Sequence, residues 1–201
     1  MSVSPSEKVQ VATENGIATV TINNPGANTW DLESLPALEA VVHALNDRSD
    51  VRALIITGNG EKFFSAGADL NQFAGGDPAA AGAIAHAFGR AFEALSDYRG
   101  VSIAAINGYA MGGGLEVALA CDIRIAERHA SLALPEAKVG LLPCAGGTQR
   151  LAQLVGEGWA KRMILCGERL AAEKALSVGL VEEVVESGEA LSTAMALATS
   201  A

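Results

Sequence analysis

In the stretch Asn107-Gly108-Tyr109-Ala110-Met111-Gly112-Gly113-Gly114-Leu115-Glu116, three consecutive glycines open an apolar segment that carries one acid in its first turn. Glycine weakens a helix interior, so adjacent glycines suit a place where the backbone approaches a ligand closely. Free N–H groups at the start of a helix can face a developing negative charge. The stretch therefore predicts a helix that begins at an oxyanion-binding turn, with Glu116 beside it. The alternative interpretation is that the glycines only let this helix pack tightly on a strand.

A second turn of small residues lies upstream, in Phe64-Ser65-Ala66-Gly67-Ala68-Asp69-Leu70. It follows an apolar strand predicted at residues 53–57, and Asp69 is a typical N-cap residue. Like the first turn, it leaves backbone N–H groups free. Two such turns can converge on a single oxygen atom.

Helical and extended periodicities alternate along the chain. Apolar residues alternate on both sides of Asn15-Gly16, which is typical of a β-hairpin, and Asp31 can cap the first predicted helix. The predicted elements are, in order, strands at 9–11 and 17–22, a helix at 32–46, a strand at 51–57, a helix at 79–96, a strand at 101–106, the glycine-started helix to 120 and a strand at 122–126. This alternation favours an α/β protein in which helices flank a sheet.

The composition indicates one compact domain, because 201 residues with 50% hydrophobic and 18% charged side chains can bury a sizeable core. We expect a flexible polar tail at residues 1–8, a core domain at 9–186 and the start of a helical segment at 187–201. The formal net charge of −9 argues against nucleic-acid and anionic-membrane partners, since both would be repelled. An anionic ligand must therefore be held by local charges.

The cysteines and histidines predict neither a disulfide framework nor a metal site. The cysteines are odd in number and widely spaced, and no basic, apolar leader is present, so a cytoplasmic location is expected. The histidines are isolated, without metal-binding spacing. No apolar run reaches the roughly 18 residues that cross a bilayer. The residues concerned are Cys121, Cys144 and Cys166, and His43, His86 and His129.

The two turn stretches together resemble the enoyl-CoA hydratase/isomerase (crotonase) superfamily. Three further stretches carry the resemblance, namely LPEAKVGLLP at 134–143, GGTQRL at 146–151 and GLVEEVV at 179–185. The similarity runs from about residue 9 to residue 185 in order and with natural spacing, which makes it far more specific than one glycine motif. It implies a crotonase-type spiral of repeated ββα units with small helices following it.

The resemblance also implies a reaction, the reversible addition of water to a trans-2-enoyl-CoA by a lyase of fatty acid metabolism. The N–H groups of Ala68 and Gly113 would stabilise the oxyanion of the thioester enolate. Glu116 would position and activate the water that attacks Cβ, and Glu136 would donate a proton at Cα. Burial and mutual repulsion are expected to raise the pKa of at least one of these acids.

Coenzyme A is expected as part of the substrate, with no separate cofactor. By resemblance, the turn residues Ala66 and Ala68 contact it through their carbonyl groups, and Gly112 lines the same binding site. Lys62 matches a basic position near the phosphates.

The chain departs from the family pattern at three places. Asn71 stands where hydratases commonly have a lysine, which concerns phosphate binding. Cys144 stands where a glycine is frequent, beside the expected acyl pocket, and is expected to fill apolar space there. Full crotonases continue past the position of Ala201 with a helical segment that completes a trimer, so we expect either a fragment or a naturally shortened homologue. The resemblance implies a homo-oligomer, either a trimer or a dimer of trimers.

Two alternatives to a hydratase remain open. One is another enolate-forming member of the superfamily, an isomerase or a decarboxylase, which would use the same oxyanion site with different acids. The other is a non-catalytic homologue that binds acyl-CoA or another subunit. Retention of both Glu116 and Glu136 favours the hydratase.

Overall fold

A computed structural model describes residues 4–73 and 75–201 of the chain. Its larger sheet has the strand order β1-β2-β3-β5-β7-β10. These strands are β1 (Val9–Glu14), β2 (Ile17–Ile22), β3 (Ala53–Gly58), β5 (Val101–Ile106), β7 (Ile123–Glu127) and β10 (Glu183–Val185). A smaller sheet has the order β4-β6-β8-β9 and consists of β4 (Phe63–Ser65), β6 (Tyr109–Met111), β8 (Ser131–Ala133) and β9 (Leu170–Ala171).

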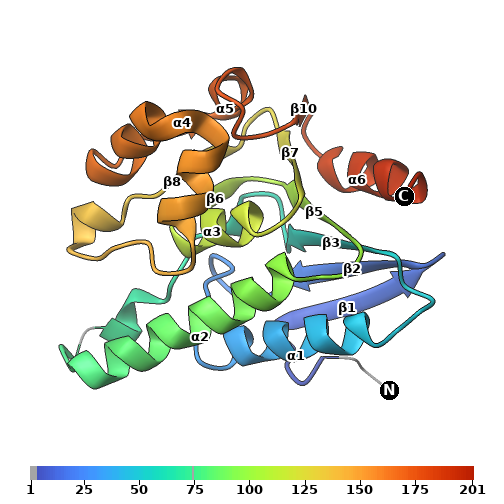
Figure 1. Cartoon of the computed structure of the whole chain (residues 1–201), viewed down its shortest axis with the longest axis horizontal. Helices are drawn as coiled ribbons and strands as arrows, with labels where there is room; N and C mark the ends of the chain where they lie inside the picture. The colour runs from blue at the N-terminus through green and yellow to red at the C-terminus, as the bar shows by residue number, and fades with distance from the viewer. Residues whose placement is uncertain (1–3, 74) are drawn as a thin grey trace.

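The helices flank both sheets (Figure 1). The α-helices are α1 (Ser34–Asn46), α2 (Pro78–Ser96), α3 (Gly113–Leu119), α4 (Gly147–Leu165), α5 (Ala172–Ser177) and α6 (Ala190–Thr199), and the 3-10 turns are η1 (Leu70–Phe73) and η2 (Glu136–Val139). A strand of the larger sheet, a strand of the smaller sheet and a helix follow one another three times, as β3-β4-α2, β5-β6-α3 and β7-β8-α4. This repeat is the predicted ββα spiral, and the α/β fold class is confirmed.

The N-terminal hairpin has the predicted turn. Strands β1 and β2 pair antiparallel with Glu14 opposite Ile17, and Asn15 and Gly16 both have positive φ, of 52° and 78°. Positive φ at both central residues defines a type I′ turn, whose twist matches that of the strands. The pairing of β2 with β3, β3 with β5, β5 with β7 and β7 with β10 is parallel.

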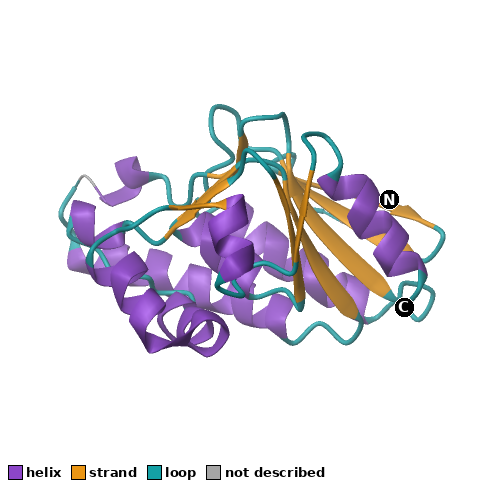
Figure 2. Ribbon diagram, turned by 90° about the horizontal axis from the view of Figure 1, so that it is seen from above, coloured by secondary structure: helices purple, strands orange, loops and turns teal. Residues whose placement is uncertain are grey.

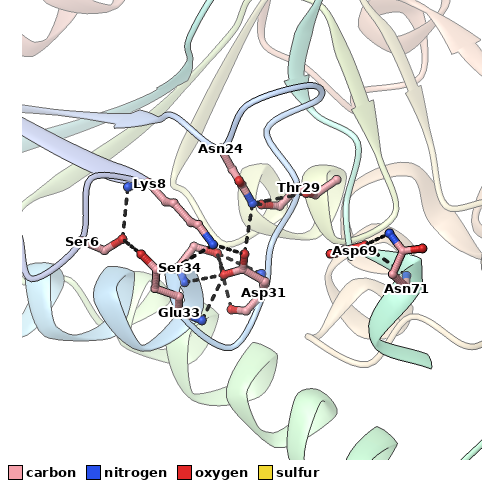
Figure 3. Close-up of polar contacts among 9 residues, drawn as sticks. All are labelled: Ser6, Lys8, Asn24, Thr29, Asp31, Glu33, Ser34, Asp69 and Asn71. Carbon is pink, nitrogen blue, oxygen red and sulfur yellow. Dashed lines mark hydrogen bonds and ion pairs between the residues drawn. The ribbon is translucent and has the colours of Figure 1, made fainter. Parts of the chain in front are cut away.

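Helix α1 begins two residues later than predicted, because Asp31 caps the turn that precedes it. The Asp31 carboxylate accepts hydrogen bonds from the backbone N–H groups of Glu33 and Ser34, at 3.0 and 2.8 Å. Lys8 lies 2.6 Å from Asp31 and 2.8 Å from Glu33 in the same polar cluster (Figure 3). Residues 1–3 of the predicted tail lie outside the described residues, whereas Ser6 and Lys8 contact this helix start.

Helix α6 packs on the face of the larger sheet opposite α1 and α2 (Figures 1 and 2). Successive side chains of a strand point to opposite faces, so Ile55 faces α6 while Leu54 and Ile56 face the main core. Ala190, Ala194 and Ala198, spaced four apart on α6, are all buried. Residues 187–201 thus supply a helix that covers a face of the sheet. Across the described residues, no helix combines the length and apolar character of a membrane span.

The three glycines at the start of α3 are places of close approach. A Cβ atom on Gly114 would lie 2.1 Å from the carbonyl oxygen of Ser65 on β4, and one on Gly113 would lie 2.6 Å from the Phe88 ring of α2. The packing interpretation of the glycine stretch therefore applies to Gly114.

We predict that Gly114→Ala lowers the free energy of unfolding by about 3 kcal/mol, because the methyl group would displace either α3 or β4. Urea unfolding followed by circular dichroism measures the change. Gly89→Ala on α2 is the matched control, since no atom lies within 4 Å of its added Cβ and alanine favours a helix. Equal stability of the two variants would contradict the close approach.

Candidate active site

The site begins where β6 turns into α3. Gly112 has a φ of 54°, and its N–H donates to the carbonyl oxygen of Ala133 on β8 at 2.9 Å. The Gly112 carbonyl accepts from the N–H groups of Leu115 and Glu116 and so closes the first turn of the helix. Within the described residues, the N–H of Gly113 donates to no protein acceptor. This free donor is the kind that a helix start offers to an anion.

The second turn lies directly against the first. A Cβ on Gly67, which has a φ of 89°, would be 2.5 Å from the Met111 carbonyl oxygen and 3.1 Å from the Gly113 nitrogen. The N–H groups on either side of Ala68 are occupied, since Gly67 donates to Ser65 Oγ and Asp69 donates to the Trp30 carbonyl. In the part of the chain that the structure describes, the Ala68 N–H has no acceptor.

Both free N–H groups belong to residues that line one cavity of about 270 Å³. The predicted acids Glu116 and Glu136 line it too, and the rest of its wall is mainly apolar. The lining residues are Ala68, Phe73, Ala81, Gly82, Ala85, Phe88, Gly113, Glu116, Glu136, Leu141, Leu142 and Cys144. The structure therefore brings the two predicted donors and the two predicted acids to the same cavity.

Glu116 is held rigidly by the loop that leads into α4. It is 2% exposed, and its Oε1 accepts hydrogen bonds from the N–H groups of Ala145 and Gly147 at 2.8 and 2.9 Å. Burial raises the pKa of this carboxyl, and the backbone donors partly oppose the rise. Its Oε2 takes part in neither of these two bonds, which leaves that oxygen for a ligand or a water molecule.

Glu136 differs from Glu116 because its charged form is supported by its own backbone N–H rather than by donors from another segment. Its Oε2 is buried without a hydrogen-bond partner in the described chain. Burial, together with the neighbouring charge of Glu116, raises its pKa from 4.5 to about 7. The side chain fits there because Gly112 has no Cβ, which would lie 2.9 Å from Glu136 Oε1.

The two carboxyls therefore differ in the protonation state that their surroundings favour. The donors on Glu116 favour its charged form, whereas the partial burial of Glu136 favours a proton on it up to about pH 7. Pairs of acids whose environments separate their protonation states are typical of acid–base catalysis.

The predicted ligand-binding residues fall in two places. Ala66 and Gly112 line a second chamber of about 450 Å³, which shares Ala68, Gly113, Glu136 and Leu141 with the first cavity. Lys62 lies instead beside another hollow, with Glu127 and His129, and its ammonium group is 5.2 Å from the centre of the Phe63 ring. The role of Lys62 in phosphate binding stays a prediction.

Sequence reasoning did not assign the groups that hold Glu116. Arg150 donates to the Ala145 carbonyl at 2.9 Å and so supports the loop whose N–H groups bind the carboxylate. Gly147 is needed there because an added Cβ would lie 2.8 Å from Glu116 Oε1. The GGTQRL stretch was the available signal, but only the fold places it against α3.

Cys144 lines the cavity beside both acids. Burial, and then the charges of Glu116 and Glu136, raise the pKa of its thiol to about 11. The group is therefore a neutral thiol near pH 7, and because Cys144 remains exposed, its role in filling apolar space stays a prediction.

The chain matches a known family over nearly its whole length. A family model described as enoyl-CoA hydratase/isomerase matches residues 12–201. The short-chain-enoyl-CoA hydratase of Clostridium acetobutylicum is 40% identical over 186 residues, which are 92% of this chain and 71% of that protein. The carnitinyl-CoA dehydratase of Salmonella arizonae is 41% identical over 193 residues, 96% of this chain and 74% of that protein.

Solved structures agree with this match. The structure of Pseudomonas aeruginosa DspI is similar with a TM-score of 0.96 and 65% identity, covering 97% of this chain and 80% of that chain. The enoyl-CoA hydratase from Bacillus anthracis is similar with a TM-score of 0.93 and 37% identity, covering 96% and 76% of the two chains.

The partial burial of the Glu136 carboxyl predicts a loss of stability as the pH rises. Its pKa is about 7 in the folded protein and about 4.5 in the unfolded chain. Between these pH values, ionisation of the Glu136 carboxyl stabilises the unfolded chain but not the folded protein. Stability is therefore lost as pH rises from about 4.5 to 7. The glutamine of Glu136→Gln does not titrate. The unfolding free energy of this variant minus that of the natural protein should therefore increase by about 2 kcal/mol over that pH interval, a value reduced for screening by water.

Urea unfolding at pH 4.5 and pH 8 measures this difference. Glu183→Gln, an exposed carboxylate on β10, is the control and should show little change with pH. A constant difference between Glu136→Gln and the natural protein at the two pH values would contradict the raised pKa.

Proposed function

The chain belongs to the enoyl-CoA hydratase/isomerase family, and we propose that it catalyses the reversible addition of water to a trans-2-enoyl-CoA. The observation that carries this proposal is the meeting of two free N–H groups and two unlike carboxyls in one apolar cavity. The cavity therefore offers groups for oxyanion stabilisation, water activation and proton donation.

The thioester carbonyl oxygen would accept hydrogen bonds from the N–H groups of Ala68 and Gly113. Negative charge develops on that oxygen when a nucleophile adds at Cβ, and fixed backbone donors stabilise it without reorganisation. One such donor is typically worth about 3 kcal/mol of barrier. The two turns that hold these donors are in contact, so the pair is preorganised.

The acids would move the protons. Glu116 Oε2 takes a proton from water while the water oxygen bonds to Cβ, and the carbon–carbon π electrons pass to the thioester as an enolate. The enolate then takes the Glu136 proton at Cα. In dehydration, Glu136 removes the Cα proton and Glu116 protonates the departing hydroxyl. In either direction the pair carries one proton throughout.

The apolar lining supports a hydrocarbon acyl tail. Phe73, Phe88 and Leu142 line the cavity together with small residues of α2. Glu116 and Glu136 are the charged groups among these lining residues, and both are engaged in the proposed reaction. A polar or charged tail would therefore find no further partner in this wall.

The proposal extends to a cytoplasmic enzyme of fatty acid metabolism that forms a trimer, as the family resemblance implies. All three cysteines are free thiols, which fits a reducing compartment. The isomerase, decarboxylase and non-catalytic alternatives are less favoured, because none of them requires this pairing of a donor-held carboxylate with an unpartnered carboxyl.

We predict that Glu116→Gln and Glu136→Gln each lower kcat for crotonyl-CoA hydration by about 100-fold to 10,000-fold, the usual contribution of a general acid or base. Loss of the enoyl absorbance follows the reaction, and chromatography identifies the 3-hydroxyacyl product. Glu183→Gln should keep the rate of the natural protein. If both cavity variants kept the rate of the natural protein, the assignment would be refuted. A product with a shifted double bond would favour the isomerase.

We also predict how the rate depends on pH. Because the acid pair must hold one proton, kcat/KM should fall as pH rises through about 7, where Glu136 loses its proton. The fall should be the same for hydration and dehydration, since their ratio is an equilibrium constant that does not involve a proton. Initial rates in both directions between pH 5.5 and 9 test this prediction. The midpoint of the fall should lie within about one pH unit of 7. A flat profile above pH 7 would contradict it.

A further inference from the structure

The second chamber has two cationic side chains on its wall that neither the family comparison nor the sequence assigned. Its lining residues include Thr29, Ala66 and Leu70, and also Lys138, Val139 and Arg169. It meets the catalytic cavity at Ala68, Gly113 and Glu136. A molecule that places its reacting carbonyl at the free N–H groups can therefore continue into this chamber.

Resting on the proposed function, we propose that Lys138 and Arg169 bind the phosphate groups of coenzyme A. The ligand is strongly anionic, and the chain has a formal net charge of −9, so local cations are needed to hold it. These two are the cationic side chains among the residues that line the chamber.

The Lys138 side chain packs against the backbone of Gly167, a glycine from another segment. Gly167 has a φ of 59°, and a Cβ there would lie 2.5 Å from Lys138 Cε and 3.1 Å from Cδ. The methylene groups of the lysine thus pack on the backbone just before β9, where Arg169 also lies. This contact joins η2 to the β9 segment and keeps the two cations on the same wall.

Both cations are available for a ligand. Within the described residues, neither Lys138 nor Arg169 forms an ion pair or a side-chain hydrogen bond. The neighbouring Glu168 binds Arg162 through two contacts of 2.6 and 2.8 Å. Asp69, the acid in the chamber wall besides Glu136, accepts hydrogen bonds from the backbone and side-chain N–H groups of Asn71 at 3.0 and 2.9 Å (Figure 3).

The inference also accounts for a departure noted in the sequence. Asn71 replaces a lysine common in related hydratases, and here it binds Asp69 rather than presenting a charge. Lys62 lines neither the cavity nor the chamber. Lys138 and Arg169 supply cationic charge to the chamber from other segments of the chain.

Binding of coenzyme A itself tests the inference without turnover. Isothermal titration compares coenzyme A, dephospho-coenzyme A and pantetheine on the natural protein, Lys138→Gln, Arg169→Gln and the double variant. We expect each single change to weaken coenzyme A binding by about tenfold, as loss of a charge-assisted hydrogen bond does, and to leave pantetheine binding unchanged. Lys161→Gln, an exposed lysine on α4, is the matched control.

The phosphate-lacking ligands identify the group that is bound. If the variants weaken dephospho-coenzyme A as much as coenzyme A, the diphosphate is the partner; if they weaken only coenzyme A, the 3′-phosphate is. Added salt should weaken binding to the natural protein more than to the double variant. Unchanged coenzyme A binding in the double variant, or equal losses for pantetheine, would overturn the inference. No binding of coenzyme A to the natural protein would overturn the proposed function as well.

Discussion

The structure depends on backbone approaches that only glycine permits at the start of α3. Gly114 touches the backbone of β4, Gly113 lies under the Phe88 ring, and Gly112 leaves room for the Glu136 carboxyl. The same three positions therefore let α3 pack on β4 and α2, shape the wall of the cavity and make room for an acid. Packing and chemistry were competing interpretations of this glycine stretch, and the fold uses it for both.

A second constraint is electrostatic. Two carboxyls lie in one apolar cavity of an acidic chain, and burial disfavours charge on either of them. The loop before α4 resolves this conflict for Glu116 by giving one of its oxygens two N–H donors. Glu136 receives neither of these donors, and burial raises its pKa to about 7. The difference between the acids thus comes from backbone on another segment rather than from the acids themselves.

Sequence patterns predicted the parts of the fold that depend on neighbouring residues, such as turns, caps and periodic strands. The hairpin at Asn15-Gly16 and strand β5 were predicted from alternation and turn chemistry, and Asp31 was recognised as a cap although its helix starts at Ser34. Strands such as β4 and β6 have three residues, too few to show a period. The donors to Glu116 lie 29 and 31 residues along the chain, and the wall formed by Lys138 and Arg169 also depends on tertiary packing. Such contacts leave no periodic signal.

The proposed reaction requires the N–H groups of Ala68 and Gly113 to point at one thioester carbonyl. Raman difference spectroscopy of bound butyryl-CoA, labelled with ¹³C at the thioester carbon, measures the polarisation of that carbonyl directly. The account predicts that its stretching band moves to lower wavenumber on binding, because two hydrogen bonds draw electrons toward the oxygen. A band at the same position as in free solution would contradict it.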